Sequence, residues 1–134
     1  MYTIEQIKNA HSKVKSGADF PAYVQELKEL GILYYEHFLS DGRTIYFGNN
    51  DFELPGPAKW ATMQIAPLRN PTNLKYFLGI HQGGQTDYMT FCEQAASSGA
   101  EKWIVDIVKM KCTYFDVAGN EMVAEEIPEL KEVF

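Results

Sequence analysis

Two segments of the chain match each other at a constant offset of 68 residues, and this internal repeat restricts the possible folds more than any other feature. They are "ADFPAYVQELKELGILYY", which begins at Ala18, and "TDYMTFCEQAASSGAEKW", which begins at Thr86. The matched positions begin a helix, line its apolar face, end it at a glycine and open a strand. The matched pairs are Asp19 and Asp87, Phe20 and Tyr88, Tyr23 and Phe91, Val24 and Cys92, Leu27 and Ala95, Gly31 and Gly99, and Tyr35 and Trp103. The pattern predicts a duplication with halves over residues 1–58 and 66–134, and a chance match of two amphipathic helices is the alternative.

Each half has the pattern of two helices followed by a β-hairpin. In the first half, Thr3 and Gln6 form a capping-box pattern that begins a helix, which we expect to end near residues 16–17. A second helix is predicted from Asp19 to a stop at Gly31. The second half repeats this arrangement, with one helix after Pro71 and another after Asp87.

Turn signals divide the predicted strands. The Asp41-Gly42 pair lies between two β-rich runs and predicts a hairpin with a two-residue type I′ turn. "KWATMQI", residues 59–65, is interpreted as a strand that links the two halves. In the second half, residues 102–115 are interpreted as one long strand with a bend or bulge, followed by a turn at residues 118–120 and a return strand.

The length of 134 residues and a hydrophobic content of 46% are typical of one globular domain. Two repeats are too few for a solenoid, which needs at least three units to bury its faces. We therefore predict a single α+β domain over residues 1–134, in which helices pack on one antiparallel β-sheet made of the two hairpin halves and the linking strand.

Charge and composition exclude several classes of function. A formal charge of −6 argues against nucleic acid as a partner, because binding to phosphates needs clustered Lys and Arg. No apolar run is long enough for a membrane span, and the N-terminal segment lacks the apolar core of a signal peptide. We expect a cytoplasmic protein with reduced cysteines, no metal and no cofactor, since neither zinc-ligand spacing nor a nucleotide-binding motif is present.

Candidate site residues gather where the two halves differ. The run His81-Gln82-Gly83-Gly84-Gln85 has the counterpart "KVKSG" in the first half, so the repeat does not require it. His81 can act as an acid, a base or a ligand, or it can be a helix-end residue whose imidazole bonds the last carbonyls. Asp87, which follows this run, is expected to be an N-cap.

Asp106 interrupts the apolar run "WIVDIV". A carboxylate there either faces water on a half-exposed strand or lies in a cleft, where it becomes a candidate for proton transfer or ligand orientation. We expect that His81, Gln82, Gln85 and Asp106 can meet in one cleft as a ligand site. Cys92 and Cys112 lie on apolar stripes and are interpreted as core residues, with a nucleophilic role as the alternative.

The runs "HQGGQTDYMTFCEQAASSGAEKWIVDIVKMKCTYFD", "SGADFPAYVQELKELGI" and "DGRTIYFG" resemble a family of uncharacterised bacterial proteins of about this length. Its members are often labelled "phage envelope protein", and the family is a domain of unknown function. The resemblance covers nearly the whole chain. It implies no catalytic residue.

The sequence leaves the function open between three hypotheses. The first is a small cytoplasmic binding or interaction module, a homodimer with a possible small-molecule ligand, since surplus strand aromatics can line a pocket or an interface. The second is a small enzyme that uses His81 or Asp106 as its acid or base. The third is a phage-related structural component.

Overall fold

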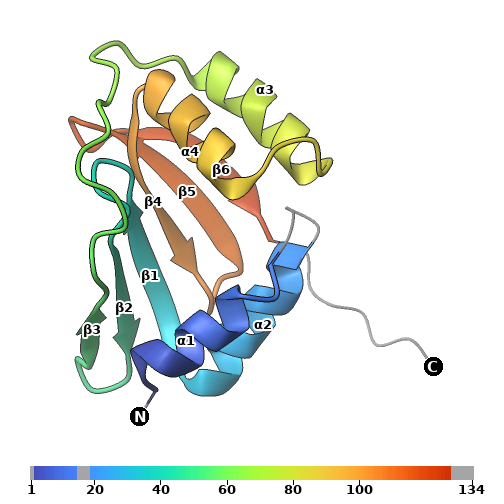
Figure 1. Cartoon of the computed structure of the whole chain (residues 1–134), viewed down its shortest axis with the longest axis vertical. Helices are drawn as coiled ribbons and strands as arrows, with labels where there is room; N and C mark the ends of the chain where they lie inside the picture. Colours follow the sequence, from blue (N-terminus) through green and yellow to red (C-terminus); the bar gives the residue numbers. More distant parts are fainter. Residues whose placement is uncertain (1, 15–18, 128–134) are drawn as a thin grey trace.

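In the computed structural model, which describes residues 2–14 and 19–127, the chain forms four helices and six strands (Figure 1). The first half contains α1 (Ile4–His11), α2 (Phe20–Leu30), β1 (Ile32–Phe38), β2 (Thr44–Gly48) and β3 (Glu53–Pro55). The second half contains α3 (Pro71–Gln82), α4 (Tyr88–Ser97), β4 (Ala100–Asp106), β5 (Lys111–Asp116) and β6 (Glu121–Glu126).

All six strands form one antiparallel sheet in the order β3-β2-β1-β4-β5-β6, so the two halves meet where β1 pairs with β4. The α1–α2 pair and the α3–α4 pair cover the same face of this sheet, one beside the other (Figure 1). This confirms the predicted α+β class with helices packed on an antiparallel sheet. Within the described part of the chain, no helix is long and apolar enough to cross a bilayer.

The strand registers of the two halves agree at the offset found in the sequence. Tyr34 pairs with Phe47, and 68 residues further on Lys102 pairs with Phe115. Both hairpins also have a register shift just before these pairs. The β1–β4 pairing is symmetric about the pair Glu36 and Ile104, which lie 68 residues apart. This geometry is what a duplication would produce, and a duplication as the origin of the chain stays a prediction.

The helix ends follow from local sequence. Thr3 and Gln6 form the predicted capping box. The expected end of this helix near residues 16–17 is wrong, because α1 ends at His11 and the Ser12 amide caps it by donating to the Lys8 and Ala10 carbonyls. Asp87 is an extended N-cap whose carboxylate accepts a hydrogen bond from the Thr90 amide at 2.7 Å. Asp19 precedes α2 with helical dihedrals instead (φ −86°, ψ −5°), so the two equivalent aspartates begin their helices differently.

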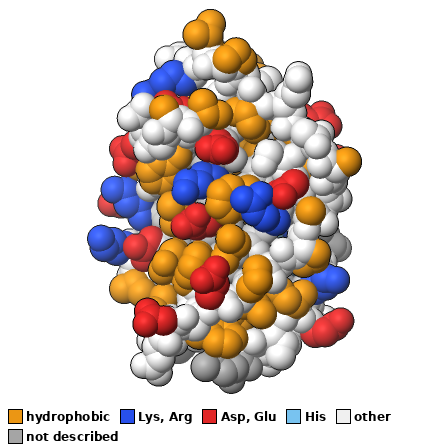
Figure 2. Space-filling model, turned by 90° about the vertical axis from the view of Figure 1, so that its left-hand side faces the viewer, with side chains coloured by type: hydrophobic (Ala, Val, Ile, Leu, Met, Phe, Trp, Pro, Cys, Tyr) orange, Lys and Arg blue, Asp and Glu red, His pale blue; other side chains and the backbone are white. Residues whose placement is uncertain are grey.

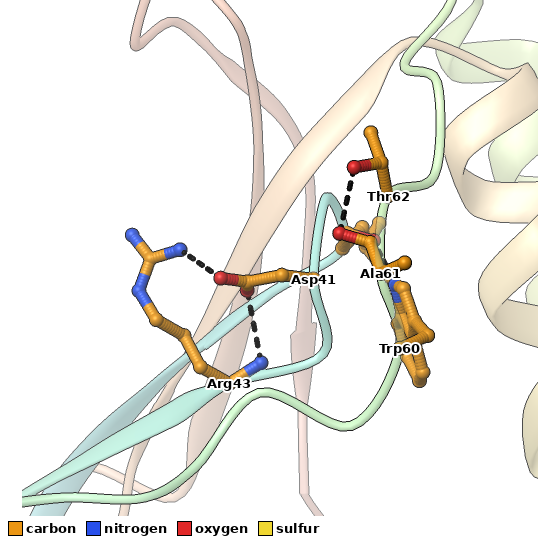
Figure 3. Close-up of polar contacts among 6 residues, drawn as sticks. Asp41, Arg43, Trp60, Ala61 and Thr62 are labelled. Carbon is orange, nitrogen blue, oxygen red and sulfur yellow. Dashed lines mark hydrogen bonds and ion pairs between the residues drawn. The ribbon is translucent and has the colours of Figure 1, made fainter.

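The predicted linking strand over residues 59–65 is wrong, since this segment is irregular. Its amides bond to the loop between β1 and β2: Lys59 and Trp60 donate to the Asp41 carbonyl at 2.8 and 3.1 Å. The Trp60 indole donates to the Leu39 carbonyl at 2.9 Å and packs on Gly42. Figure 3 shows Trp60 beside the loop that holds Asp41. The segment therefore folds across the end of a hairpin instead of joining the sheet, and β3 forms in a stretch whose glycine and prolines favoured a loop.

The predicted type I′ turn at Asp41-Gly42 is also wrong, because the β1–β2 loop spans residues 39–43. Gly42 has a positive φ of 73°, while Asp41 does not adopt one. The Asp41 carboxylate instead accepts hydrogen bonds from the Arg43 amide at 3.1 Å and from the Arg43 guanidinium at 2.9 Å (Figure 3). Asp41 thus stabilises a longer loop by its side chain rather than by its backbone.

The single strand predicted over residues 102–115 is divided into β4 and β5 by a turn. The Asp106 carboxylate accepts a hydrogen bond from the Lys109 amide at 3.0 Å, which is a turn-forming contact. Met110 closes this turn with a positive φ of 52°, at the position equivalent to Gly42 in the first half. The β-branched residues on both sides conceal this turn in the sequence, because a non-glycine residue seldom adopts positive φ.

The sheet has one face that no helix covers. On this face Tyr34 stacks on Phe47 with ring centroids 4.4 Å apart, and Lys102 forms an ion pair with Glu36 at 3.4 Å. Viewed from the left of Figure 1, the surface mixes hydrophobic side chains with acidic and basic ones (Figure 2). The expected homodimer stays a prediction.

Candidate functional site

A cavity of about 420 Å³ lies between the sheet and the two helix pairs. Its lining includes side chains from both halves and contains eight aromatic residues besides histidine: Phe20, Tyr23, Tyr35, Tyr46, Tyr88, Phe91, Trp103 and Tyr114. A volume of this size is within the range of small-molecule sites, which are largely apolar with a few polar groups.

The strand residues among these side chains lie on the helix-covered face of the sheet, which forms the floor of the cavity. They share this face because every second residue of a strand points to the same side. Strand pairing puts them in two rows across the sheet. One row is Thr44, His37, Trp103, Tyr114 and Val123, and the other is Tyr46, Tyr35, Val105, Cys112 and Glu125. The floor is therefore assembled from strands of both halves.

His37 lies at the centre of a hydrogen-bonded chain in this floor. It is 2% exposed, its Nδ1 lies 2.8 Å from Thr44 Oγ1, and its Nε2 lies 2.6 Å from the Tyr88 hydroxyl. Burial, followed by the positive charge of Lys59, lowers the pKa of His37 to about 3. The imidazole is thus neutral with a single N–H, so one hydroxyl must donate to it and the other must accept from it.

Lys59 and His11 lie beside this chain. The Lys59 ammonium lies 5.3 Å from the centroid of the Tyr88 ring, and the His11 ring contacts the same ring edge-on at 5.7 Å. Desolvation lowers the pKa of Lys59, although the residue as a whole is exposed at the rim. Desolvation and the charge of Lys59 lower the pKa of His11. This end of the cavity therefore has one cation and two neutral imidazoles near pH 7.

His81, the first of the predicted site residues, lines the cavity at the end of α3. Its ring stacks on Phe91 with centroids 4.6 Å apart, and its Nδ1 lies 3.1 Å from both the carbonyl and the hydroxyl of Thr86. A carbonyl can only accept, so Nδ1 has the proton and Nε2 is the acceptor. Desolvation lowers the pKa of His81. The residue closes the α3–α4 junction and faces the cavity as well.

Gln82 lines the cavity with His81, and its Nε2 donates to Glu125 Oε2 at 3.0 Å. Gln85 and Asp106 are not among the lining residues. The Gln85 amide donates to the Ile80 carbonyl at 3.2 Å, which closes the end of α3. The structure thus brings together two of the four predicted site residues.

Asp106 lies on the other side of the sheet from the cavity. It pairs with Tyr34 in β1 and with Lys111 in β5, in the strand phase opposite to Val105 and Cys112. The expectation that Asp106 meets His81 in one cleft is therefore not met, because Asp106 belongs to a turn at the end of β4. The half-exposed alternative describes its position.

The cavity residues that sequence reasoning missed are His37, Tyr88, Lys59 and Glu125. His37 alternates in phase with Tyr35, and Tyr88 matches Phe20 in the repeat, so both fit a structural role. A hydroxyl on Tyr88 where the repeat has Phe20 was the one available signal. The contact between His37 and Tyr88 depends on how α4 crosses the sheet, and the spacing of residues in the sequence does not determine this crossing.

Both cysteines are buried. Desolvation raises the pKa of Cys92 and that of Cys112 to about 12, so each is a neutral thiol near pH 7. Their buried positions match the core interpretation. Among the described residues, no group of three His, Cys, Asp or Glu side chains is placed to hold a metal ion.

Comparison with known proteins places this fold in a family. The family described as a protein of unknown function (DUF1398) matches residues 8–126, from within α1 to the end of β6. The uncharacterized protein YcgX of Escherichia coli (strain K12) is 20% identical over 119 residues, which is 89% of this chain and 89% of that protein. Neither description names an activity. The match covers most of the chain, and the chain therefore belongs to the DUF1398 family.

Proposed function

We propose that this protein is a small-molecule binding module and that the cavity between the helix pairs and the sheet is its site. The observation that supports this most is the cavity itself, with a volume of about 420 Å³ and eight lining aromatic residues. Aromatic side chains provide large apolar contact areas at a low cost in conformational entropy. A ligand with a flat apolar body fits this lining.

The packing of the core supports the same proposal. Protein interiors are close-packed, and side chains beside a cavity lack part of their dispersion contacts. A bound apolar molecule restores these contacts and stabilises the folded state by mass action. The hydroxyl of Tyr88 and the neutral imidazole of His37 offer hydrogen bonds that would orient such a molecule.

The enzyme alternative with His81 or Asp106 as its acid or base has less support. Asp106 does not line the cavity, and the Nδ1 atom of His81 is held by the carbonyl and hydroxyl of Thr86. Protonated, buried thiols also give no support to a covalent mechanism. The proposal includes the cytoplasmic location expected from the sequence.

A cavity-filling variant tests the proposal. Val14 is half-buried and lines the cavity, so Val14→Trp should fill part of its volume. Val108→Trp is the matched control, because Val108 is 69% exposed in the β4–β5 turn and the variant has the same composition. The probe is a neutral phenyl-naphthylamine fluorophore, whose emission rises in apolar sites.

We expect saturable, one-to-one binding by the natural chain and by Val108→Trp. In Val14→Trp the affinity should be at least about tenfold lower, since lost apolar burial removes roughly 1.5 kcal/mol or more of binding free energy. Thermal unfolding of both variants checks that they fold. Equal binding by the two variants would place the fluorophore outside the cavity. A natural chain that binds neither the fluorophore nor any member of a broad metabolite panel would refute the proposal.

A further inference from the structure

The polar groups of the cavity are divided between two ends. Lys59, His11 and His37 lie at the β1 end, around the Tyr88 ring. Gln82 and Glu125 lie at the β6 end. Three strand spacings (β1 to β4, β4 to β5, β5 to β6) separate the strands of His37 and Glu125, which is about 14 Å at ~4.8 Å per spacing. The cavity thus has a cationic end and an anionic end.

Glu125 presents its carboxylate to the cavity. It pairs with Cys112, whose side chain lies on the cavity floor, so both point to the helix-covered face. Its contact in the structure is the Gln82 amide at 3.0 Å. In residues 2–14 and 19–127, no cation lies within ion-pair distance of Glu125. A half-buried carboxylate without an ion-pair partner is the natural place for a positive group of a ligand.

Aromatic rings line the floor between the two ends. Trp103 and Tyr114 have ring centroids 5.4 Å apart, and Phe91 lies 5.8 Å from Trp103 and 6.2 Å from Tyr114. The faces of such rings attract organic cations, and Trp and Tyr attract them most. This floor extends from His37, whose ring centroid lies 4.4 Å from that of Trp103, to Tyr114 on β5, the strand that pairs with the strand of Glu125. The carboxylate and the aromatic faces both favour an organic cation.

The remaining titratable groups of the cavity lining do not oppose the binding of a cation at the β6 end. Desolvation keeps His11, His37 and His81 neutral near pH 7, so among the described residues that line the cavity Lys59 is the one cation, and it lies at the opposite end. An anionic group at the β6 end would meet the charge of Glu125 in a chain of net charge −6. Repulsion and loss of hydration would both oppose it.

From this arrangement we infer that the ligand is an organic amine, bound with its ammonium group at Glu125 and its apolar body along the aromatic floor toward Tyr88. The inference rests on the proposed function, since it assigns the ligand class of the same cavity.

A matched set of three ligands tests the amine assignment: phenylbutylamine, phenylbutanol and phenylbutyrate are a cation, a neutral molecule and an anion with the same body. Their affinities are measured by calorimetry at pH 7. We expect the amine to bind about tenfold or more tightly than the alcohol, and the anion to bind most weakly, because a charge-assisted contact forms only with the amine.

Variants then locate the ammonium group. In Glu125→Gln the amine should bind within about twofold of the alcohol, because the neutral amide removes the charge and keeps the shape. Glu121→Gln is the matched control, since Glu121 is exposed at the start of β6 and does not line the cavity. Gln82→Lys supplies a cation beside Glu125 and should also weaken amine binding, even if Glu125→Gln does not fold.

The outcomes separate the two proposals. Equal affinities for amine and alcohol, tighter binding of phenylbutyrate, or an unchanged amine preference in both Glu125→Gln and Gln82→Lys would overturn the amine assignment and leave the cavity as a binding site. Binding of the neutral fluorophore without any binding of the amine would do the same. Failure of all three ligands and of the fluorophore would refute the binding function itself.

Discussion

At the scale of single residues, His37 is the clearest example of a side chain whose role depends on its surroundings. In the sequence it is one of three scattered histidines in a β-rich run. In the structure it is buried, and both ring nitrogens have hydroxyl partners, Thr44 and Tyr88. Burying an imidazolium without a carboxylate is costly, so the protein stabilises the neutral form.

The depressed pKa of His37 makes the stability depend on pH. The unfolded chain takes up a proton at His37 below its ordinary pKa of 6.5, whereas the folded chain does so only near 3. The stabilisation is therefore complete above pH 6.5 and is lost as the pH falls from 6.5 toward 3. His11 and His81, whose pKa values are also lowered, contribute in the same direction.

We expect the free energy of unfolding to fall with a slope of about 1.4 kcal/mol per pH unit from His37 alone in this window. Denaturant titrations at several pH values measure the slope. NMR titration of the histidine ring protons, with His37→Gln to assign the signal, identifies the residue. A His37 signal that titrates near pH 6.5 would contradict the prediction.

At the scale of helices and strands, the two halves use equivalent glycines in different surroundings. Gly31 and Gly99 end α2 and α4 in the left-handed region, with φ values of 95° and 92°. A Cβ atom on Gly31 would have no heavy atom within 4 Å, whereas one on Gly99 would lie 2.7 Å from the Arg69 Cα atom. Gly31 and Gly99 thus have the same backbone conformation, but only Gly99 has a neighbouring segment, at Arg69, close to it.

This difference predicts unequal costs for the same substitution. Gly31→Ala should lower the free energy of unfolding by about 1 kcal/mol, the cost of a left-handed conformation with a Cβ atom. Gly99→Ala should lower it by a further 1 to 3 kcal/mol, roughly, because the backbone at Arg69 must move. Urea denaturation of both variants compares the costs directly. Equal destabilisation would mean that the segment at Arg69 moves away freely.

At the scale of the whole molecule, neither half has the cavity by itself. The first half supplies Tyr35, His37 and the α1–α2 wall, and the second half supplies Trp103, Tyr114 and the α3–α4 wall. The halves join through β1 and β4, where the pairing is symmetric about Glu36 and Ile104. A separate half would leave this strand as an unpaired edge, which favours association with another strand.

We therefore expect that a fragment of residues 66–134 is not a folded monomer. It should be unfolded, or it should form a dimer in which β4 pairs with β4 of a second copy near Ile104, because the equivalent register already exists in the intact chain. Sedimentation velocity and circular dichroism of the fragment test this. Adding residues 1–65 should restore the tryptophan emission of the intact chain, and a stable folded monomer of residues 66–134 would contradict the expectation.

Local signals in the sequence were sufficient for much of the fold. The Thr3 capping box, the Asp87 N-cap and the glycines at the helix ends act within a few residues, so they could be recognised without tertiary information. The repeat predicted two helices followed by strands in each half, but it missed β3 and the turn that divides residues 102–115 into β4 and β5. The features that were recognised depend on backbone geometry and on burial, which sequence periodicity reports.

The predictions that failed depend on contacts between distant segments. Residues 59–65 have a strand-like composition, but hydrogen bonds to the β1–β2 loop hold them outside the sheet. Asp106 was placed with His81 because both are polar features of the second half that the repeat does not require. One residue's difference in strand phase puts Asp106 on the opposite face of the sheet instead. Sequence by itself determined the class of the fold, the helix starts at Thr3 and Asp87, the helix ends at Gly31 and Gly99, and the buried stripes, because local geometry and hydrophobicity specify them. Only the tertiary structure decided the cavity, the partners of His37 and the position of Glu125, because these require the register of β1 on β4 and the crossing of α3 and α4 over the sheet.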